Sequence, residues 1–149
     1  MRKNLPVTDN EKTFPSNQKL ISSTDLKGKI RHCNSAFVEV SGFSRDELIG
    51  QPHNIVRHPD MPPAAYENMW SHLKAGQPWM GLVKNRCKNG DYYWVSAYVT
   101  PVTENGKVVG YESVRSCPDR QDVARAEKLY ADIRSGHSGI RFWQRFQPP

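Results

Sequence analysis

The chain has 149 residues, of which 37% are hydrophobic, and a formal net charge of +6. It therefore predicts one modest domain with flanking segments, and its charge suits either an anionic partner or a solvated basic surface. No apolar run approaches the roughly 18 residues of a membrane span, no secretory signal opens the chain, and three widely spaced cysteines favour a reduced, cytoplasmic protein over a disulfide scaffold.

The chain opens with a polar segment and a hairpin. Residues 1–18 are mostly polar and broken by proline, which predicts a poorly ordered N-terminal arm. Residues 19–25 and 29–33 are predicted strands, because the Lys27-Gly28 pair between them is typical of a turn.

Two short helices are predicted after this hairpin. Asn34 is suited to cap the first helix, and Gly42 is suited to end it. Ser44 and Glu47 then form the S-x-x-E pattern of a capping box, and Gly50 closes the second helix.

A longer helix is predicted within residues 62–76. Tyr66, Met69, Trp70 and Leu73 recur at i, i+3, i+4 and i+7, so the helix has one apolar face. The two prolines that precede this pattern are compatible only with a first helical turn.

The second half of the chain predicts a meander of three strands. Residues 78–87, 92–103 and 108–117 are rich in aromatic and β-branched side chains, which favour strands. An Asn-Gly pair lies in each of the two intervening turns and favours a tight hairpin.

A helix and a basic tail close the chain. The helix carries an a/d-type seam formed by Val123, Ala126, Tyr130 and Ile133. This seam predicts either a homodimer contact or packing of the helix on its own domain, with packing favoured. The tail at residues 140–149 is basic and aromatic, which suggests a membrane-surface or partner-binding segment.

The order of these elements predicts an α+β domain with a five-stranded antiparallel sheet and short helices over one face. We expect the domain at residues 19–118, after the arm at 1–18 and before a lead-out helix and tail at 119–149. Because short helices leave room for a pocket rather than a solid core, a small ligand is expected between helices and sheet.

The stretch QPHNIVRHPDMP at residues 51–62 concentrates charged and imidazole groups just before the longer helix. Arg57 is suited to bidentate phosphate contact, and the nearby helix N-terminus adds exposed N–H groups. The alternative is a loop held by an Arg57–Asp60 contact, with Asp60 also capping the helix. His58 lies between them and offers a further hydrogen-bonding group.

Asn85 is unusual on its predicted strand, because alternation places it on the same face as Trp79. A buried amide needs hydrogen-bond partners. Asn85 is therefore either satisfied within the protein or aimed at the donor and acceptor edge of a heterocycle. Asn34 poses the same choice, with its capping role favoured.

Other kinds of site find little support. His53 and His58, even with Cys33 or His72, match no zinc spacing, so no metal is expected. The basic residues are scattered and form no nucleic-acid-binding signature, so no nucleic-acid partner is expected. No acid–base pair stands out, so we expect no enzymatic activity.

Two stretches are distinctive in combination: GQPHNIVRHPDMP at residues 50–62 and VKNRCKNGDYYWV at 83–95. Through these, and through weaker matches from about Ile21 to about Ile133, the chain resembles the N-terminal flavin-binding PAS domain of bacterial aerotaxis receptors. The resemblance implies a PAS fold with non-covalently bound FAD. It also implies that the redox state of FAD is passed to a HAMP or chemotaxis signalling module, in this chain or in a partner.

The resemblance also implies site residues. Arg57, His58 and Asp60 match the segment with which the family holds FAD, and Arg57 is expected at the diphosphate. Four further positions match the family's pocket: Asn34, His53, Asn85 and Trp79. We expect Asn85, with Asn34 or His53, at the ring edge, and Trp79 or Trp70 packed near the ring. Any membrane association would come from other segments or from a partner.

Several alternatives stay open. A haem-binding PAS sensor could use His53, His58 or His72 as axial ligand. A cofactor-free PAS module could act through protein contacts alone. A blue-light sensor that forms a cysteinyl adduct is disfavoured, because Cys33 precedes Asn34 and the NCRFLQ stretch of that family is missing.

Overall fold

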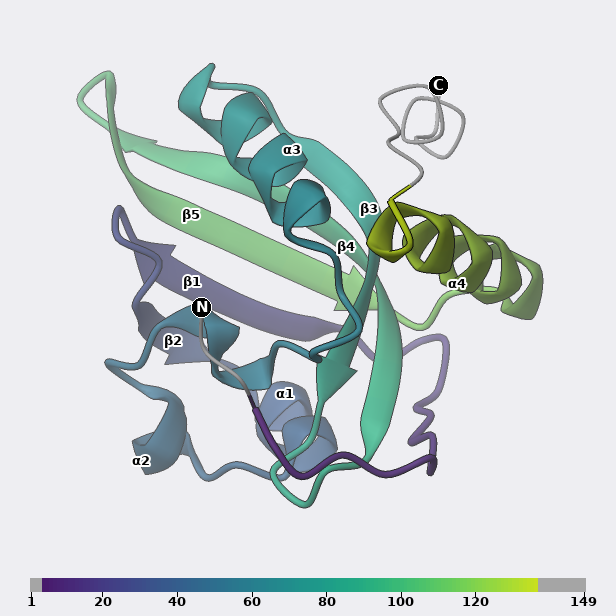
Figure 1. The fold of residues 1–149 in the computed structure, drawn as a ribbon. Helices are drawn as coiled ribbons and strands as arrows, with labels where there is room; N and C mark the ends of the chain where they lie inside the picture. The colour runs from purple at the N-terminus through teal and green to yellow at the C-terminus, as the bar shows by residue number, and fades with distance from the viewer. Residues whose placement is uncertain (1–3, 137–149) are drawn as a thin grey trace.

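The structure is a computed structural model, and it describes residues 4–136. A five-stranded antiparallel sheet in the order β2-β1-β5-β4-β3 forms its centre (Figure 1). The strands are β1 (Leu20–Asp25), β2 (Ile30–Cys33), β3 (Trp79–Arg86), β4 (Tyr92–Glu104) and β5 (Lys107–Ser116). The expected α+β class and antiparallel sheet are confirmed.

The helices of the described residues are α1 (Ser35–Ser41), α2 (Arg45–Leu48), the short 3-10 helix η1 (His53–Val56), α3 (Pro63–Lys74) and α4 (Arg120–Arg134). Local sequence signals explain where the first two begin. Asn34 accepts a hydrogen bond from the backbone N–H of Phe37, and Ser44 with Glu47 forms the predicted capping box. The sequence did not predict η1.

Alternation along the strands gives the sheet two differently covered faces. Val95, Ala97 and Val99 of β4 face α3, and the short helices lie over this side, as expected. Trp94 points to the other face, where its ring stacks on Tyr130 of α4 with centroids 6.2 Å apart. Helix α4 therefore packs against the opposite face of the sheet.

The seam predicted on the last helix packs on its own domain. Val123, Ala126 and Tyr130 are buried, and Ile133 is partly buried against the core. The Tyr130 hydroxyl donates a hydrogen bond of 2.6 Å to the Leu82 carbonyl of β3. The packing alternative is therefore confirmed for this seam.

Residues 4–14 lie along the domain and do not form the poorly ordered arm that the sequence predicts. The Asn4 amide donates to the Arg57 carbonyl at 2.8 Å, and the backbone of Lys12 donates to that of Tyr92 at 2.7 Å. Phe14 is buried in the core. The prediction is wrong for this segment because polar composition does not reveal backbone hydrogen bonds to a distant strand.

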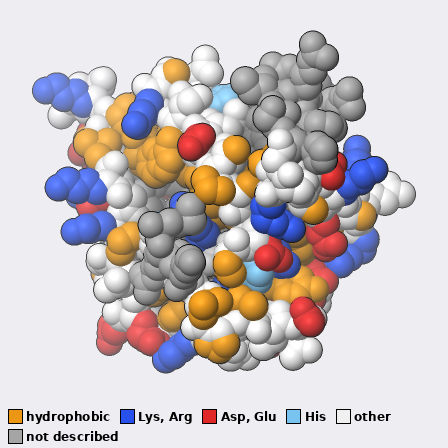
Figure 2. All heavy atoms as spheres, viewed as in Figure 1, with side chains coloured by type: hydrophobic (Ala, Val, Ile, Leu, Met, Phe, Trp, Pro, Cys, Tyr) orange, Lys and Arg blue, Asp and Glu red, His pale blue; other side chains and the backbone are white. Residues whose placement is uncertain are grey.

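The tail predicted at residues 140–149 lies outside the described residues, and the boundaries at residues 18 and 118 stay predictions. Between residues 4 and 136, no helix is both long enough and apolar enough to span a bilayer. On the face shown in Figure 2, Lys and Arg side chains are interspersed with Asp, Glu and apolar groups rather than gathered into one basic patch.

Candidate ligand-binding site

A cavity of about 270 Å³ lies between α3 and the sheet. The predicted apolar face of α3 lines it through four side chains: Tyr66, Met69, Trp70 and Leu73. The opposite wall comes from the sheet and includes Val95, Ala97 and Val99. The predicted helix face is thus correct, and it covers a hollow of nearly the size typical of ligand pockets, roughly 300–1,000 Å³.

The small residue Ala97 in the middle of the sheet lines this hollow. Gly81 of β3, Ala97 of β4 and Arg115 of β5 lie directly opposite one another in neighbouring strands. A Cβ atom at Gly81 would lie 2.5 Å from the indole of Trp79, so that ring folds over the glycine. The Trp79 indole nitrogen donates to the Asn68 side chain at 2.8 Å, which holds the ring in place.

Gly81→Ala is expected to displace the Trp79 indole and to lower the free energy of unfolding by about 1–3 kcal/mol, a typical cost of overpacking. Urea denaturation of Gly81→Ala, of Trp79→Leu and of the variant that combines the two would measure the loss of stability. The cost of the added methyl group should largely disappear when the indole is absent. An equal cost in both backgrounds would show that the indole is not the obstacle.

Arg57 and Asn85 face the cavity together. The segment containing Arg57 runs along the free edge of β3 and forms a single antiparallel bridge with Asn85. Since bridge partners share a face of a sheet, both residues line the cavity. The Arg57 guanidinium carbon lies 3.6 Å from the ring centroid of Tyr66, and Nε of Arg57 is buried without a hydrogen-bond partner among the described residues.

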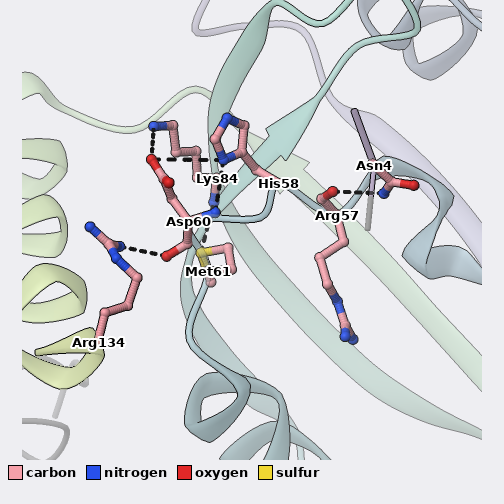
Figure 3. A network of polar contacts seen from close by, with 7 residues as sticks. All are labelled: Asn4, Arg57, His58, Asp60, Met61, Lys84 and Arg134. Carbon is pink, nitrogen blue, oxygen red and sulfur yellow. Dashed lines mark hydrogen bonds and ion pairs between the residues drawn. The ribbon is translucent and has the colours of Figure 1, made fainter. Parts of the chain in front are cut away.

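His58 and Asp60 point away from Arg57 and belong to a separate cluster (Figure 3). The Asp60 carboxylate pairs with the Lys84 ammonium at 2.9 Å, and its backbone N–H donates to Nδ1 of His58 at 3.0 Å. Arg134 of α4 donates to the Asp60 carbonyl. Neither His58 nor Asp60 lines the cavity. Extended backbone explains the split, since successive side chains alternate in direction.

The contacts of this cluster show that the alternative considered for residues 51–62, a loop held by an Arg57–Asp60 contact and a cap from Asp60, is wrong. Lys84, and not Arg57, pairs with Asp60. Helix α3 begins after Pro62 with no side-chain cap, so Asp60 does not cap it. Burial and then the Lys84 ammonium lower the pKa of His58 to about 4, so this imidazole is neutral at physiological pH.

Asn34 also lies outside the cavity lining. Its carboxamide oxygen accepts from the backbone N–H groups of Ile21 and Phe37, and its nitrogen donates to the Lys19 carbonyl at 2.8 Å. The side chain therefore ties α1 to β1, which is the capping role favoured by the sequence.

Trp70 and Trp79 both line the cavity, as expected of residues that could pack against a ring. Trp70 meets Tyr111 of β5 edge-on, with centroids 5.3 Å apart. Aromatic side chains from α3, β3 and β5 thus surround the hollow, which suits a flat aromatic ligand.

Arg115 is the site residue that sequence reasoning missed. It lines the cavity, is 2% exposed, and donates to Nε2 of His53 at 2.8 Å and to the Ser22 hydroxyl at 2.9 Å. Alternation along β5 could have revealed it, because Tyr111 and Arg115 share the inner face. The same argument singled out Asn85 in the sequence.

His53 also lines the cavity and is held as a neutral imidazole. Because a guanidinium can only donate, Nε2 of His53 must accept, which puts the ring proton on Nδ1. Its ring stacks on Phe37 with centroids 5.8 Å apart. Burial, and then the charges of Arg115 and Arg57, lower the pKa of His53 to about 3.

The free energy of unfolding is therefore expected to fall as the pH is lowered from 7 to 5. In the unfolded chain His53 titrates near pH 6.5, so below that pH the unfolded state binds a proton that the folded state does not. One such histidine contributes up to about 1.4 kcal/mol per pH unit. Urea denaturation at pH 7, 6 and 5 should show a smaller loss in a His53→Asn variant, and an equal loss would contradict the assignment.

The cavity is electropositive. Within residues 4–136, neither Arg57 nor Arg115 pairs with a carboxylate, and Glu112 is the one acidic residue along the cavity wall. Glu112 is exposed, and alternation directs its side chain to the opposite face of β5. The same described residues contain no cluster of three or more His, Cys, Asp or Glu that could hold a metal ion. The donor set suits an anionic, aromatic ligand.

Comparison with known proteins agrees with this architecture. Residues 30–115 match the family model described as the PAS fold. The chain is 47% identical over 135 residues to the aerotaxis receptor of Escherichia coli (strain K12), an alignment that covers 91% of this chain and 27% of the receptor. It is 34% identical over 82 residues to the nitrogen fixation regulatory protein of Klebsiella pneumoniae, covering 55% of this chain and 17% of that protein.

Solved structures share the fold. The light-state structure of the blue-light photoreceptor Aureochrome1 LOV superposes with a TM-score of 0.66 at 20% identity, covering 80% of this chain and 93% of that one. A PAS domain from Colwellia psychrerythraea superposes with a TM-score of 0.56 at 26% identity, covering 67% and 86%. The family model matches more than half of the chain, and the resemblance to the PAS domain of aerotaxis receptors is confirmed; the chain therefore belongs to the PAS-fold family.

Proposed function

We propose that this chain is a redox-sensing PAS domain that binds FAD in the cavity and serves aerotaxis-type signal transduction. The observation that carries the proposal is the pair of cavity-lining guanidiniums, Arg57 and Arg115, neither of which has a carboxylate partner within residues 4–136. An anionic ligand would compensate them. The 47% identity to an aerotaxis receptor supports the biological role.

The residues of the cavity fit a flavin. Flavin takes up and releases electrons reversibly, and its reduced ring can carry a negative charge. Trp70 and Trp79 would pack against a flat ring, and the buried amide of Asn85 would meet its polar edge. Three residues of the lining carry a buried polar atom without a partner within residues 4–136, and these atoms are available to a polar ligand: Nε of Arg57, Nε of Arg115 and Oδ1 of Asn54.

The size of the cavity bears on the choice of cofactor. A hollow of about 270 Å³ accommodates one fused ring system, so the rest of a dinucleotide would extend beyond it. Arg57 is only half-buried and is suited to bind a diphosphate bidentately. The proposal therefore assigns Arg57 to the diphosphate of FAD.

His58, Asp60 and Asn34 receive a supporting role in this proposal. His58 and Asp60 tie the segment that carries Arg57 to β3 and α4 through Lys84 and Arg134. Asn34 holds the start of α1, whose Phe37 lies under Arg115. Their substitution would weaken FAD binding by moving other residues, without loss of a direct contact.

The proposal also includes the signalling partner of this PAS domain and its location in the cell. This chain spans 27% of the aerotaxis receptor that it matches. We expect a HAMP or other chemotaxis signalling module to receive the signal, in the same chain or in a partner, with the PAS domain in the cytoplasm and without enzymatic activity. A homodimer would have to use a surface other than the α4 seam, which is buried against the domain.

Haem is a weaker candidate. His53 lines the cavity, but its Nε2 already accepts a hydrogen bond from Arg115. His72 lies outside the lining and its Nδ1 contacts the Asn68 carbonyl at 2.9 Å. A cofactor-free interaction module is the remaining alternative.

An absorption spectrum of freshly purified protein tests the proposal, followed by denaturation and chromatography of any released chromophore. Flavin bands with FAD in the extract are the expected result, and an intense Soret band would indicate haem instead. Protein that purifies colourless and takes up no added FAD would leave the cofactor-free module. FMN in the extract would support a flavin sensor but reject the assignment of Arg57 to a diphosphate.

A further inference from the structure

Arg115 is a buried cation whose partners are all uncharged. Its guanidinium donates to Ser22 and His53 and lies 4.4 Å from the ring centroid of Phe37, while its Nε is buried without a partner in the described part of the chain. A buried charge without a counter-charge is costly, by several kcal/mol in real proteins. The fold therefore retains a cation at this position that no carboxylate of residues 4–136 neutralises.

The surroundings of Arg115 preserve its positive charge. Burial lowers the pKa of the guanidinium to about 10, which is still well above neutral pH. His53 is neutral, Ser22 is a hydroxyl, and the exposed Glu112 alternates to the other face of β5. One full positive charge is thus presented at the cavity wall.

The position of Arg115 in the sheet places this charge at the cavity wall beside Ala97. Ala97 of β4 is its cross-strand neighbour and lines the cavity, and the small side chain of Ala97 leaves space beside the guanidinium. Gly81 of β3, one strand further on, is covered by the indole of Trp79. A planar ring accommodated over Ala97 lies next to the guanidinium. Arg57 reaches the cavity from a different element, the segment at the edge of β3.

We propose that Arg115, held by Ser22 and His53, sets the reduction potential of the bound flavin by favouring its reduced, negatively charged form. This inference rests on the proposed function and separates two roles. Arg57 binds the ligand through a charge that is the same in both redox states. Arg115 binds the reduced state more tightly than the oxidised one, and only such differential affinity shifts an equilibrium.

The test is the midpoint potential of the FAD-loaded chain in Arg115→Gln, with Arg115→Lys retaining the charge. Arg86→Gln is the matched control, because Arg86 is also a buried arginine of the sheet but lies outside the cavity. Arg115→Gln is expected to reduce the preference for the reduced flavin at least tenfold. For a two-electron couple this moves the potential about 30 mV more negative. Arg86→Gln is expected to leave it unchanged, and Arg115→Lys to move it less than Arg115→Gln.

A second pair of variants tests the charge while retaining the guanidinium. Ser22→Asp would place a carboxylate beside Arg115 and neutralise it, whereas Ser22→Asn has nearly the same size and no charge. The potential is expected to become more negative in Ser22→Asp than in Ser22→Asn. This pair answers the question even if Arg115→Gln does not fold.

The outcomes separate this inference from the proposed function. FAD bound at an unchanged potential in Arg115→Gln, or an equal potential in the two Ser22 variants, would overturn the role of Arg115 and leave FAD binding intact. An equal loss of affinity for oxidised and reduced FAD in Arg115→Gln would make Arg115 a simple anchor and also reject the inference. A wild-type chain that takes up no flavin would reject both.

Discussion

Arg57→Ala is expected to weaken FAD binding by roughly 10- to 100-fold, because a hydrogen bond to a charged group contributes about 1.5–3 kcal/mol. The guanidinium lies over Tyr66 at the cavity wall, and its Nε has no hydrogen-bond partner among residues 4–136. The substitution removes this Nε donor together with the guanidinium contact to Tyr66. Titration of FAD into the apo chain, followed by flavin fluorescence, would measure the effect.

Two controls separate the charge of Arg57 from its packing and geometry. Arg125→Ala removes an exposed arginine that pairs with Asp122 on α4, far along the chain from the cavity segment, and should leave the affinity for FAD unchanged. Arg57→Lys keeps the charge but not the bidentate fork, so its affinity should lie between wild type and Arg57→Ala. Wild-type affinity in a folded Arg57→Ala variant would reject the diphosphate assignment.

Phe37→Ala is expected to lower the free energy of unfolding by about 3–5 kcal/mol, the usual cost of emptying a large buried site. The Phe37 side chain is completely buried. Its ring stacks on His53 and lies 4.4 Å from the guanidinium carbon of Arg115. One side chain therefore supports both the core and the polar residues of the cavity wall. Urea denaturation monitored by circular dichroism would measure the loss.

Phe37→Leu is the matched control for this large effect. It retains most of the apolar volume and should cost less than about 1.5 kcal/mol. It also removes the aromatic surface beneath Arg115 and His53, so any additional loss of FAD affinity in this variant would report on those contacts. Equal destabilisation by alanine and leucine would show that the ring contacts, and not the buried volume, dominate.

The cluster in Figure 3 connects the segment that lines the cavity with the last helix, so it could transmit a structural change caused by reduction of the ligand. Arg57 lines the cavity. Asp60, which follows it by three positions in the chain, contacts both Lys84 of β3 and Arg134 of α4. Within the proposed function, a change at the ligand therefore has a short physical route to the last helix.

Much of the fold could be predicted from the sequence because its signals are local. Asn34, the Ser44–Glu47 capping box and the Asn-Gly turns each act within a few residues of themselves. The apolar face of α3 follows from helical periodicity alone. A resemblance over two distinctive stretches predicted the PAS fold, which the match of residues 30–115 confirms.

Only the tertiary structure decided which of the candidate residues share a site. Arg57 and His58 are adjacent in sequence, yet extended backbone directs them to opposite sides, and Asp60 pairs with Lys84 from a distant strand. Arg115 enters the cavity because β5 lies between β1 and β4 in the sheet. Cavity walls and ion pairs join residues far apart in the chain, so local propensity determines the elements while strand order and register determine the site.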